Sequence, residues 1–419
     1  MPIDQVELGR RLRRAREACG LTQEEVAEQM GISRPTVAQM ELGKRAVNSV
    51  ELDRLAYLYA RDIREFLAED FTEDEVVRAL FRSDTDADQE GVRQALRDCI
   101  ALGHELTNLE DLLGIARGVA TAAAYSIPAI RSRWEAIQAG EHVALEERRR
   151  LGLGSAPAGD LVRLLESQGV RTGVVDMPDD ISGLTIAHPH VGLFVVVNRR
   201  HAPVRQRFSW CHEYAHVLLD RIAAGRISRA SDRTDLIEVR ANAFAASFLM
   251  PVEGVRQYVA ALGKGASSRI HAEIFDEAGV VPVDARTEPG SQSLQLYDVV
   301  PMAHFFGVSV LSALYRLRNL RLLSDAEFDH LKEQDQEGRS EEIRTGLNLP
   351  AVEGAAHAGE FSRRFMSLAL EAYRRERITK SKLRQLAGRI GVSAETVQML
   401  IESAGLEDNE PESVLIPGE

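Results

Sequence analysis

Thr22-Gln-Glu-Glu-Val-Ala-Glu-Gln-Met-Gly-Ile-Ser33 is the stretch that decides the fold at the start of this 419-residue chain. Thr22 with Glu25 three residues later is the pattern of a capping box, which predicts a helix through Met30. Gly31 ends that helix, because glycine adopts a positive φ without strain, and Ser33 caps the next one. The stretch therefore predicts two short helices joined by a tight turn.

The residues on either side extend this unit. Leu8, Leu12 and Ala15 have helical spacing before Gly20, which predicts a helix in front of the quoted stretch. The helix that Ser33 caps is expected to run to about residue 42, and another is expected over residues 49–59. Residues 1–64 are thus predicted to form a compact set of short helices.

The second helix of the turn has the composition of a helix that reads DNA. Val37 and Met40 are expected to face inward, whereas Arg34 and Gln39 have the donors and acceptors that match G and A edges in the major groove. Lys44 lies just past this helix, where it can contact phosphate. The residues that we expect to bind DNA are Arg10, Arg14, Gln23, Ser33, Arg34, Thr36, Gln39, Lys44 and Arg45.

Residues 8–59 closely resemble the Xre/Cro-type repressor family. The resemblance rests on Gly20-Leu-Thr-Gln-Glu-Glu-Val-Ala27, on Gly31-Ile-Ser33 and on Glu41-Leu-Gly-Lys-Arg45. It implies sequence-specific binding to a double-stranded DNA operator, by a homodimer on a palindromic site, because one helix reads only a few base pairs. With this likeness the arginine run Arg10–Arg16, which composition alone leaves open as a solvated helix face, is expected to contact phosphate.

The charge and cysteine content limit the kind of protein this is. The net charge is −13; residues 1–64 hold eleven Lys/Arg against ten Asp/Glu, a balance of +1, so the rest carries −14. This balance argues against a general nucleic-acid coat. Three cysteines are too few for a disulfide framework. The most apolar stretch, Gly118–Ile130, is 13 residues long and contains Pro128, so no membrane span is expected and the protein is expected in the cytoplasm.

A second pattern, His212-Glu-Tyr-Ala-His216, has the spacing of a zinc site. Histidines at i and i+4 lie on one face of a helix, and Glu213 lies beside them, where it can act as a general base toward water. Glu238 on the next helix is the expected third ligand, and Asn242, four residues later, is expected to hydrogen-bond one of the ligands. Asp232 and Asp235 compete with Glu238 as the third ligand.

Residues 160–320 look like the ImmA/IrrE metallopeptidase family. The likeness rests on Arg207-Phe-Ser-Trp-Cys-His-Glu-Tyr-Ala-His216, on Glu238-Val-Arg-Ala-Asn242 with the residues up to Pro251, and on Ala303–Leu317. It implies that His212, His216 and Glu238 bind Zn²⁺ and that Glu213 is the general base. Many relatives carry an acidic residue where this chain has Arg240. That position does not hold a metal ligand in the family.

Together these patterns predict a multidomain, mainly α protein with a small β-sheet, an α+β architecture. The expected domains are an all-α helix-turn-helix domain at 1–64, a helical connector at 65–150, a zincin-like HExxH metallopeptidase domain at 151–320 and a C-terminal helical region at 321–419. A Gly/Ala/Pro stretch, 151–159, is the expected linker. Within the peptidase-like domain we expect helices at 160–168, 203–220 and 235–249, strands at 171–175, 182–187 and 192–197, and a loop at 280–292.

The pattern Ala-x-x-x-Gly-[Ile/Val]-Ser occurs three times, at Ala27–Ser33, Ala303–Ser309 and Ala387–Ser393. Each copy is placed to end a helix at glycine and cap a new one at serine, which predicts three helix-turn-helix-like units. The second copy continues in apolar residues and the third in acidic ones, so both are expected to pack or to contact protein rather than to bind DNA.

Two functions remain open at this point. One is a DNA-bound regulator whose zinc site cleaves a partner repressor, a toxin or this chain itself, with Tyr297 or His271 as candidates for stabilising the oxyanion. The other is a transcription factor or antitoxin that uses the peptidase-like domain to sense a signal or bind a partner. Three protein ligands would leave a coordination position open for catalysis, whereas a closed four-ligand site would favour the second function.

Overall fold

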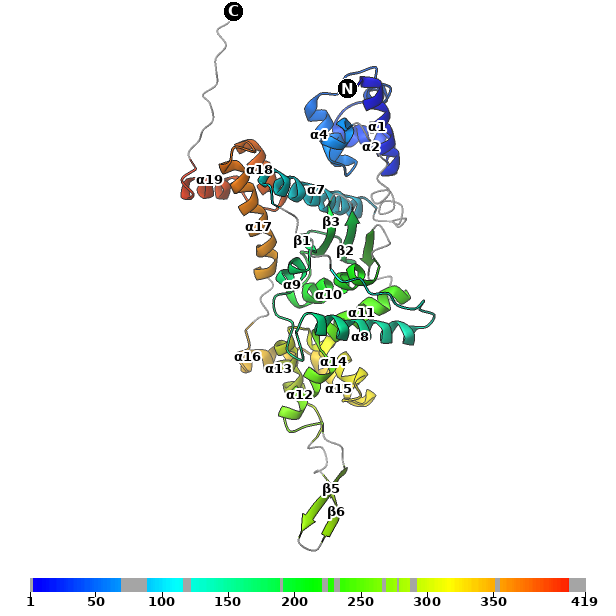
Figure 1. The fold of residues 1–419 in the computed structure, drawn as a ribbon, viewed down its shortest axis with the longest axis vertical. Coiled ribbons are helices and arrows are strands. Elements are labelled where there is room, and N and C mark those ends of the chain that lie inside the picture. The colour runs from blue at the N-terminus through cyan, green and yellow to red at the C-terminus, as the bar shows by residue number, and fades with distance from the viewer. Residues whose placement is uncertain are drawn as a thin grey trace, which may run out of the picture. The chain divides into compact units, whose positions relative to one another are not determined.

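The computed structural model describes residues 3–68, 89–115, 122–188, 191–220, 225–229, 234–265, 269–276, 279–286, 292–350 and 355–406. It divides the chain into two compact units. One comprises residues 1–119, 189–191 and 358–419, and the other comprises 120–188 and 192–357. The chain is mainly helical with a small sheet (Figure 1), which confirms the predicted multidomain α+β class.

The first unit is entirely helical in its described residues. The capping box of Thr22 and Glu25 is present, and Gly31 follows α2 with φ 68°, as predicted. Val37 and Met40 are buried inside the unit, also as predicted. Its helices are α1 (Gln5–Ala18), α2 (Gln23–Met30), α3 (Arg34–Glu41), α4 (Ser49–Leu58), α5 (Ile63–Leu67), α7 (Gln89–Leu113), α17 (Ala355–Arg374), α18 (Lys380–Arg389) and α19 (Ala394–Ser403).

The second unit is built around a four-stranded sheet with the order β1-β3-β2-β4. Its strands are β1 (Arg171–Val175), β2 (Ile181–His188), β3 (Gly192–Asn198) and β4 (Gly225–Arg229). The pairing of β1 with β3 is parallel, and β2 pairs antiparallel with both β3 and β4. The first three strands confirm the predicted ones, and Phe194–Val197 of β3 are fully buried. The sequence did not predict β4.

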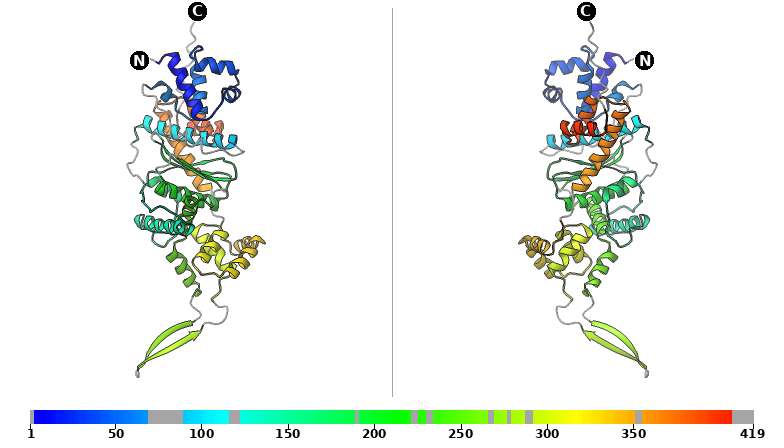
Figure 2. Two further views of the ribbon diagram at one scale, coloured as in Figure 1. Left: turned by 90° about the vertical axis from the view of Figure 1, so that its right-hand side faces the viewer. Right: turned by 90° about the vertical axis from the view of Figure 1, so that its left-hand side faces the viewer.

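Helices cover the sheet in layers. Figures 1 and 2 show α10 (Pro203–Leu219) against the sheet, followed by α11 (Leu236–Leu249) and α8 (Arg133–Arg150). The chain places α9 (Leu161–Ser167) before β1, and the remaining helices are α12 (Val252–Ala261), α13 (Leu296–Phe306), α14 (Val310–Asn319), α15 (Asp325–Gln336) and α16 (Arg339–Gly346). No single helix in the described ranges is long and apolar enough to cross a membrane; α13 and α14, bent by 103°, pass only as a pair, by length and composition.

Two sequence expectations are wrong. Residues 280–292 were expected to form a loop, but β6 (Gly279–Arg286) pairs with β5 (Arg269–Asp276) as a separate two-stranded sheet. Such a sheet has only edge strands, which tolerate a proline such as Pro282. Residues 65–150 were expected to be helical, yet 122–131 are not. Pro128 interrupts that segment, and the amide of Tyr125 bonds instead to the carbonyl of Leu218, at 3.0 Å.

The three repeats have the same turn geometry, as predicted, but only Ser309 and Ser393 accept a capping hydrogen bond from the next helix, whereas Ser33 does not. Gly31, Gly307 and Gly391 have φ of 68°, 66° and 78°. The amide that follows each glycine bonds to the carbonyl of the alanine that starts the repeat, at 3.0, 2.9 and 2.9 Å. The second copy is built into the second unit, because the buried guanidinium of Arg207 on α10 donates to the carbonyl of Gly307 at 3.1 Å.

Candidate metal centre and nucleic-acid interface

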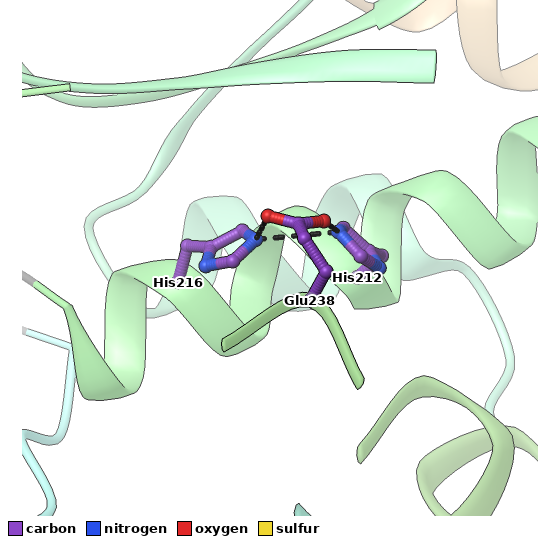
Figure 3. A group of neighbouring side chains, drawn as sticks. All are labelled: His212, His216 and Glu238. Atoms are coloured by element: carbon purple, nitrogen blue, oxygen red, sulfur yellow. Dashed lines mark hydrogen bonds and ion pairs between the residues drawn. The ribbon is translucent and has the colours of Figure 1, made fainter. Parts of the chain in front are cut away.

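Three buried side chains from α10 and α11 converge on one point. His212 and His216 lie one turn apart on α10, and their Nε2 atoms are 3.2 Å apart. Glu238, in the first turn of α11, places Oε2 at 2.9 Å from Nε2 of His212 and Oε1 at 3.5 Å from Nε2 of His216. Figure 3 shows the carboxylate facing both rings.

The spacing of these atoms fits a tetrahedral zinc ion. Zinc bonds of about 2.0–2.1 Å at tetrahedral angles put neighbouring ligand atoms roughly 3.3 Å apart. The three separations of 2.9, 3.2 and 3.5 Å lie around that value. Within the described part of the chain, this is the only group of three His, Cys, Asp or Glu ligands so closely placed. Such a set would leave one of four coordination positions open.

The other nitrogen of each ring is held by a hydrogen bond. Asn242 Oδ1 lies 3.0 Å from Nδ1 of His212, and Asp220 Oδ2 lies 2.8 Å from Nδ1 of His216. With the ring N–H donating at Nδ1, each Nε2 keeps its lone pair for the point where the three side chains meet. Asn242 was expected in this role. Asp220 was not, although its position four residues after His216 on the same helix could have identified it.

Arg240 acts on the site through Asp220. Its guanidinium lies 2.5 Å and 2.6 Å from the two carboxylate oxygens of Asp220. Burial alone would raise the pKa of Asp220, but the hydrogen bonds from His216 and Arg240 outweigh it and hold that pKa below its ordinary value. Arg240 therefore favours the ionised form of Asp220 and orients it toward His216.

The electrostatic field where the three side chains meet favours a positive charge. Burial lowers the pKa of His212, but the hydrogen bond to Glu238 and the charges of Glu213 and Glu238 outweigh burial and raise that pKa above its ordinary value. Two carboxylates in a water-excluded place thus favour positive charge on the ring. A divalent metal ion would supply that charge instead.

Four other residues were candidates for the third ligand or for stabilising the oxyanion, and the structure describes the side chains of two of them, Asp235 and Tyr297. Asp235 is the N-cap of α11 and accepts from the amide of Ile237 at 2.9 Å, so its carboxylate caps the helix that carries Glu238. Tyr297 is exposed on α13, with Lys264 Nζ 5.2 Å from its ring centre. Asp232 and the side chain of His271 lie outside the described residues.

In the first unit, α3 presents the predicted polar end to solvent. Arg34, Gln39 and Lys44 are exposed, opposite the buried Val37 and Met40. Ser33 stands at the N-cap, where its hydroxyl lies 2.8 Å from that of Thr36. The arrangement leaves the side chains that we expect to read bases at the accessible end of the helix.

The neighbouring residues are partly held by contacts within the unit. Gln23 Nε2 donates to Glu41 at 2.8 Å, Arg45 pairs with Glu51 at 2.8 Å, and Arg10 pairs with Glu7 at 2.9 Å. These contacts orient the three long side chains against carboxylates of the same unit. Arg10 and Arg14 are both exposed on α1.

The arginine run on α1 is not a single phosphate-contacting face, which corrects the sequence interpretation. Arg11 and Arg16 are only 5% and 8% exposed. Arg11 donates to the carbonyl of Phe66 at 2.9 Å, and Arg16 donates to Glu41 at 2.6 Å. Their charges are satisfied inside the unit, where they tie α1 to α5 and α3. This leaves Arg10, Arg13 and Arg14 exposed.

Comparison with known families agrees with this geometry. Residues 7–67 match the family model of a helix-turn-helix domain, and residues 165–318 match that of an IrrE N-terminal-like domain. No curated protein matches the chain. The two matched ranges contain α3 and the three converging side chains, respectively. The chain is therefore a helix-turn-helix domain fused to an ImmA/IrrE-type domain, a DNA-binding regulator with a peptidase-family domain.

Proposed function

We propose that this regulator is a zinc-dependent endopeptidase that cleaves a partner protein, which is a repressor, a toxin or this chain itself. The observation that supports the proposal is the convergence of His212, His216 and Glu238 at zinc-ligand spacing, with no fourth His, Cys, Asp or Glu ligand beside them among the described residues. A non-proteolytic platform would be expected to close the site with a fourth ligand.

Each residue has a defined task in this proposal. A zinc ion at the centre would supply Lewis-acid chemistry, polarising the scissile carbonyl and making water more acidic. Glu213 takes the proton of the attacking water and passes it to the leaving amine. Asn242 and Asp220 hold the two imidazoles in the tautomer that binds through Nε2.

The DNA-binding half of the proposal rests on α3. Arg34 and Gln39 would read base edges, while Lys44, Arg10 and Arg14 would contact phosphates. We further propose a homodimer on a palindromic operator, since one recognition helix covers only a few base pairs.

The endopeptidase is tested by looking for new protein N-termini. Zinc-loaded wild type and Glu213→Gln are each incubated with an extract of the source cells, and N-termini are labelled and sequenced. We expect a small set of new N-termini with wild type that Glu213→Gln does not produce, although Glu213→Gln still binds zinc. Glu253→Gln, an exposed change on α12, is the control and should match wild type. The same N-termini from wild type and Glu213→Gln would refute the peptidase and favour a partner-binding platform.

A further inference from the structure

The side chain of Glu213 lies against β2, on the face of the sheet that α10 covers. Glu213 is 0% exposed, and Thr185 of β2 is buried beside it. The hydroxyl of Thr185 lies 2.8 Å from Oε2 of Glu213 and 3.1 Å from the backbone carbonyl of the same residue. A hydroxyl has one proton, and a carboxylate oxygen is a stronger acceptor for it than a backbone carbonyl.

The second carboxylate oxygen of Glu213, Oε1, differs from Oε2 in its hydrogen bonding. Oε1 of Glu213 is buried and has no hydrogen-bond partner among the described residues. A buried acceptor left without a donor is costly, so its presence needs an explanation, and a role in catalysis is one such explanation. Here one oxygen is fixed by Thr185 and the other is left able to accept a proton.

Gly183 makes room for this carboxylate. A Cβ atom at Gly183 would lie 2.7 Å from Oε1 of Glu213 and 2.8 Å from its Cγ. Gly183 and Thr185 are two residues apart on β2, so they face the same side of the strand. The pairing of β2 with β4 shifts register between Ile181 and Gly183, a bulge of the kind found beside active sites.

We infer that Gly183 and Thr185 are positioning residues for Glu213: Thr185 fixes one carboxylate oxygen, and Gly183 admits the other to the place where it accepts a proton. This inference rests on the proposed peptidase function. It assigns to β2 a part in catalysis that neither HExxH nor the third-ligand pattern contains.

The first test is cleavage in the labelled cell extract described above. Thr185→Val, which keeps the shape but removes the hydroxyl, should lower the rate at which the new N-termini appear by about tenfold or more. Thr185→Ser should restore most of that rate. The matched control is Thr172→Val, because Thr172 is a buried threonine of β1 that donates to Glu166 at 2.9 Å. Gly183→Ala, whose added carbon would meet the side chain of Glu213 first, should displace its carboxylate and cleave as poorly as Glu213→Gln.

The second test needs neither activity nor metal. Both tryptophans, Trp134 and Trp210, belong to the second unit, so their fluorescence follows the unfolding of that unit in the full chain. Unfolding is measured in urea with a chelator present, and Thr185→Val is introduced into both wild type and Glu213→Ala. The substitution should raise the unfolding constant roughly tenfold more in wild type, because in Glu213→Ala no carboxylate is left without a donor. If Glu213→Ala does not fold, Glu213→Gln takes its place.

The outcomes separate the two proposals. If the wild type cleaves nothing but Thr185 and Glu213 are coupled in unfolding, the peptidase is wrong and the positioning of Glu213 stands. If the wild type cleaves and Thr185→Val behaves as Thr172→Val in both tests, the positioning role is wrong and the peptidase stands.

Discussion

At the scale of single residues, Asp220 contacts the candidate metal centre through the ring of His216. Changing a hydrogen-bond partner of a metal-bound histidine typically costs about 10–100-fold in metal affinity. We therefore expect Asp220→Asn to weaken zinc binding by that factor, measured by competition with a chromogenic chelator. Asp176→Asn, at an exposed carboxylate beside Arg199, is the control. Equal zinc affinity for the two variants would show that Asp220 does not support the site.

The DNA-binding residues separate into two classes that salt can distinguish. Arg34→Ala or Gln39→Ala should relax the preference for particular bases in the operator. Lys44→Ala should weaken binding to all sequences evenly and reduce the slope of log affinity against log salt by roughly 0.9. Arg54→Ala, an exposed change on α4, is the control. An unchanged footprint and salt slope for all three variants would refute the assignment of α3.

The sequence could propose the two histidine ligands because their spacing is local, with His212 and His216 one helical turn apart. Glu238 lies 26 positions from His212. Spacing alone left Asp232 and Asp235 as competitors, and the resemblance to a known family favoured Glu238. The contacts of Thr185 with Glu213, and of Arg16 with Glu41, join residues 28 and 25 positions apart. Such pairs depend on how elements pack, which spacing along the chain does not encode. For the same reason the arginine run could not be divided into buried and exposed members before the fold was known.

At the scale of elements, the repeated turns offer a comparison of matched glycines. Gly31 has open space where a Cβ would point, so Gly31→Ala should cost only the backbone strain of a positive φ, roughly 1–2 kcal/mol. At Gly307 an added Cβ would also lie 2.8 Å from Nε of the buried Arg207. Gly307→Ala should therefore destabilise the second unit by more than this, measured from tryptophan fluorescence in urea. The stability lost on Gly31→Ala is measured by circular dichroism. A smaller loss of stability for Gly307→Ala than for Gly31→Ala would contradict this explanation.

The stability of the second unit should depend on pH through Glu147, a buried residue of α8. Burial alone would raise the pKa of Glu147, but hydrogen bonds from Arg150 and from two tyrosines outweigh it and hold that pKa below 4.5, its ordinary value. A lowered pKa stabilises the folded state above 4.5, and this stability is lost as pH falls toward the folded-state pKa. Glu147→Gln should lower the urea midpoint at pH 7 and flatten its decline below pH 4.5. A parallel decline in wild type and variant would contradict this.

Some elements were predictable and others were not, for physical reasons. The strands β1 to β3 combine apolar runs with clear turn signals, and α10 and α11 combine helical spacing with Pro203 and Pro251 at their limits. The short β4 lacks an apolar run and exists through its pairing with β2. Residues 122–131 contain good helix formers, but Pro128 and the bond from Tyr125 to Leu218 override that local preference.

At the scale of the whole molecule, the proposed DNA-reading helix and the proposed metal site belong to separate compact units. The helix α3 lies in the first unit and all three proposed zinc ligands lie in the second. We expect removal of metal by a chelator to leave operator affinity within about twofold, measured by fluorescence anisotropy at fixed salt, because no zinc ligand belongs to the DNA-reading unit. Loss of operator binding on chelation would show that the metal also supports the DNA-binding state.

Titration of the metal-stripped full chain with Zn²⁺ tests the central claim most directly. The three converging side chains predict one high-affinity zinc site per chain, which is absent in Glu238→Ala and retained in Glu253→Ala. Equal zinc binding by wild type and Glu238→Ala, or none by a correctly folded wild type, would contradict the account.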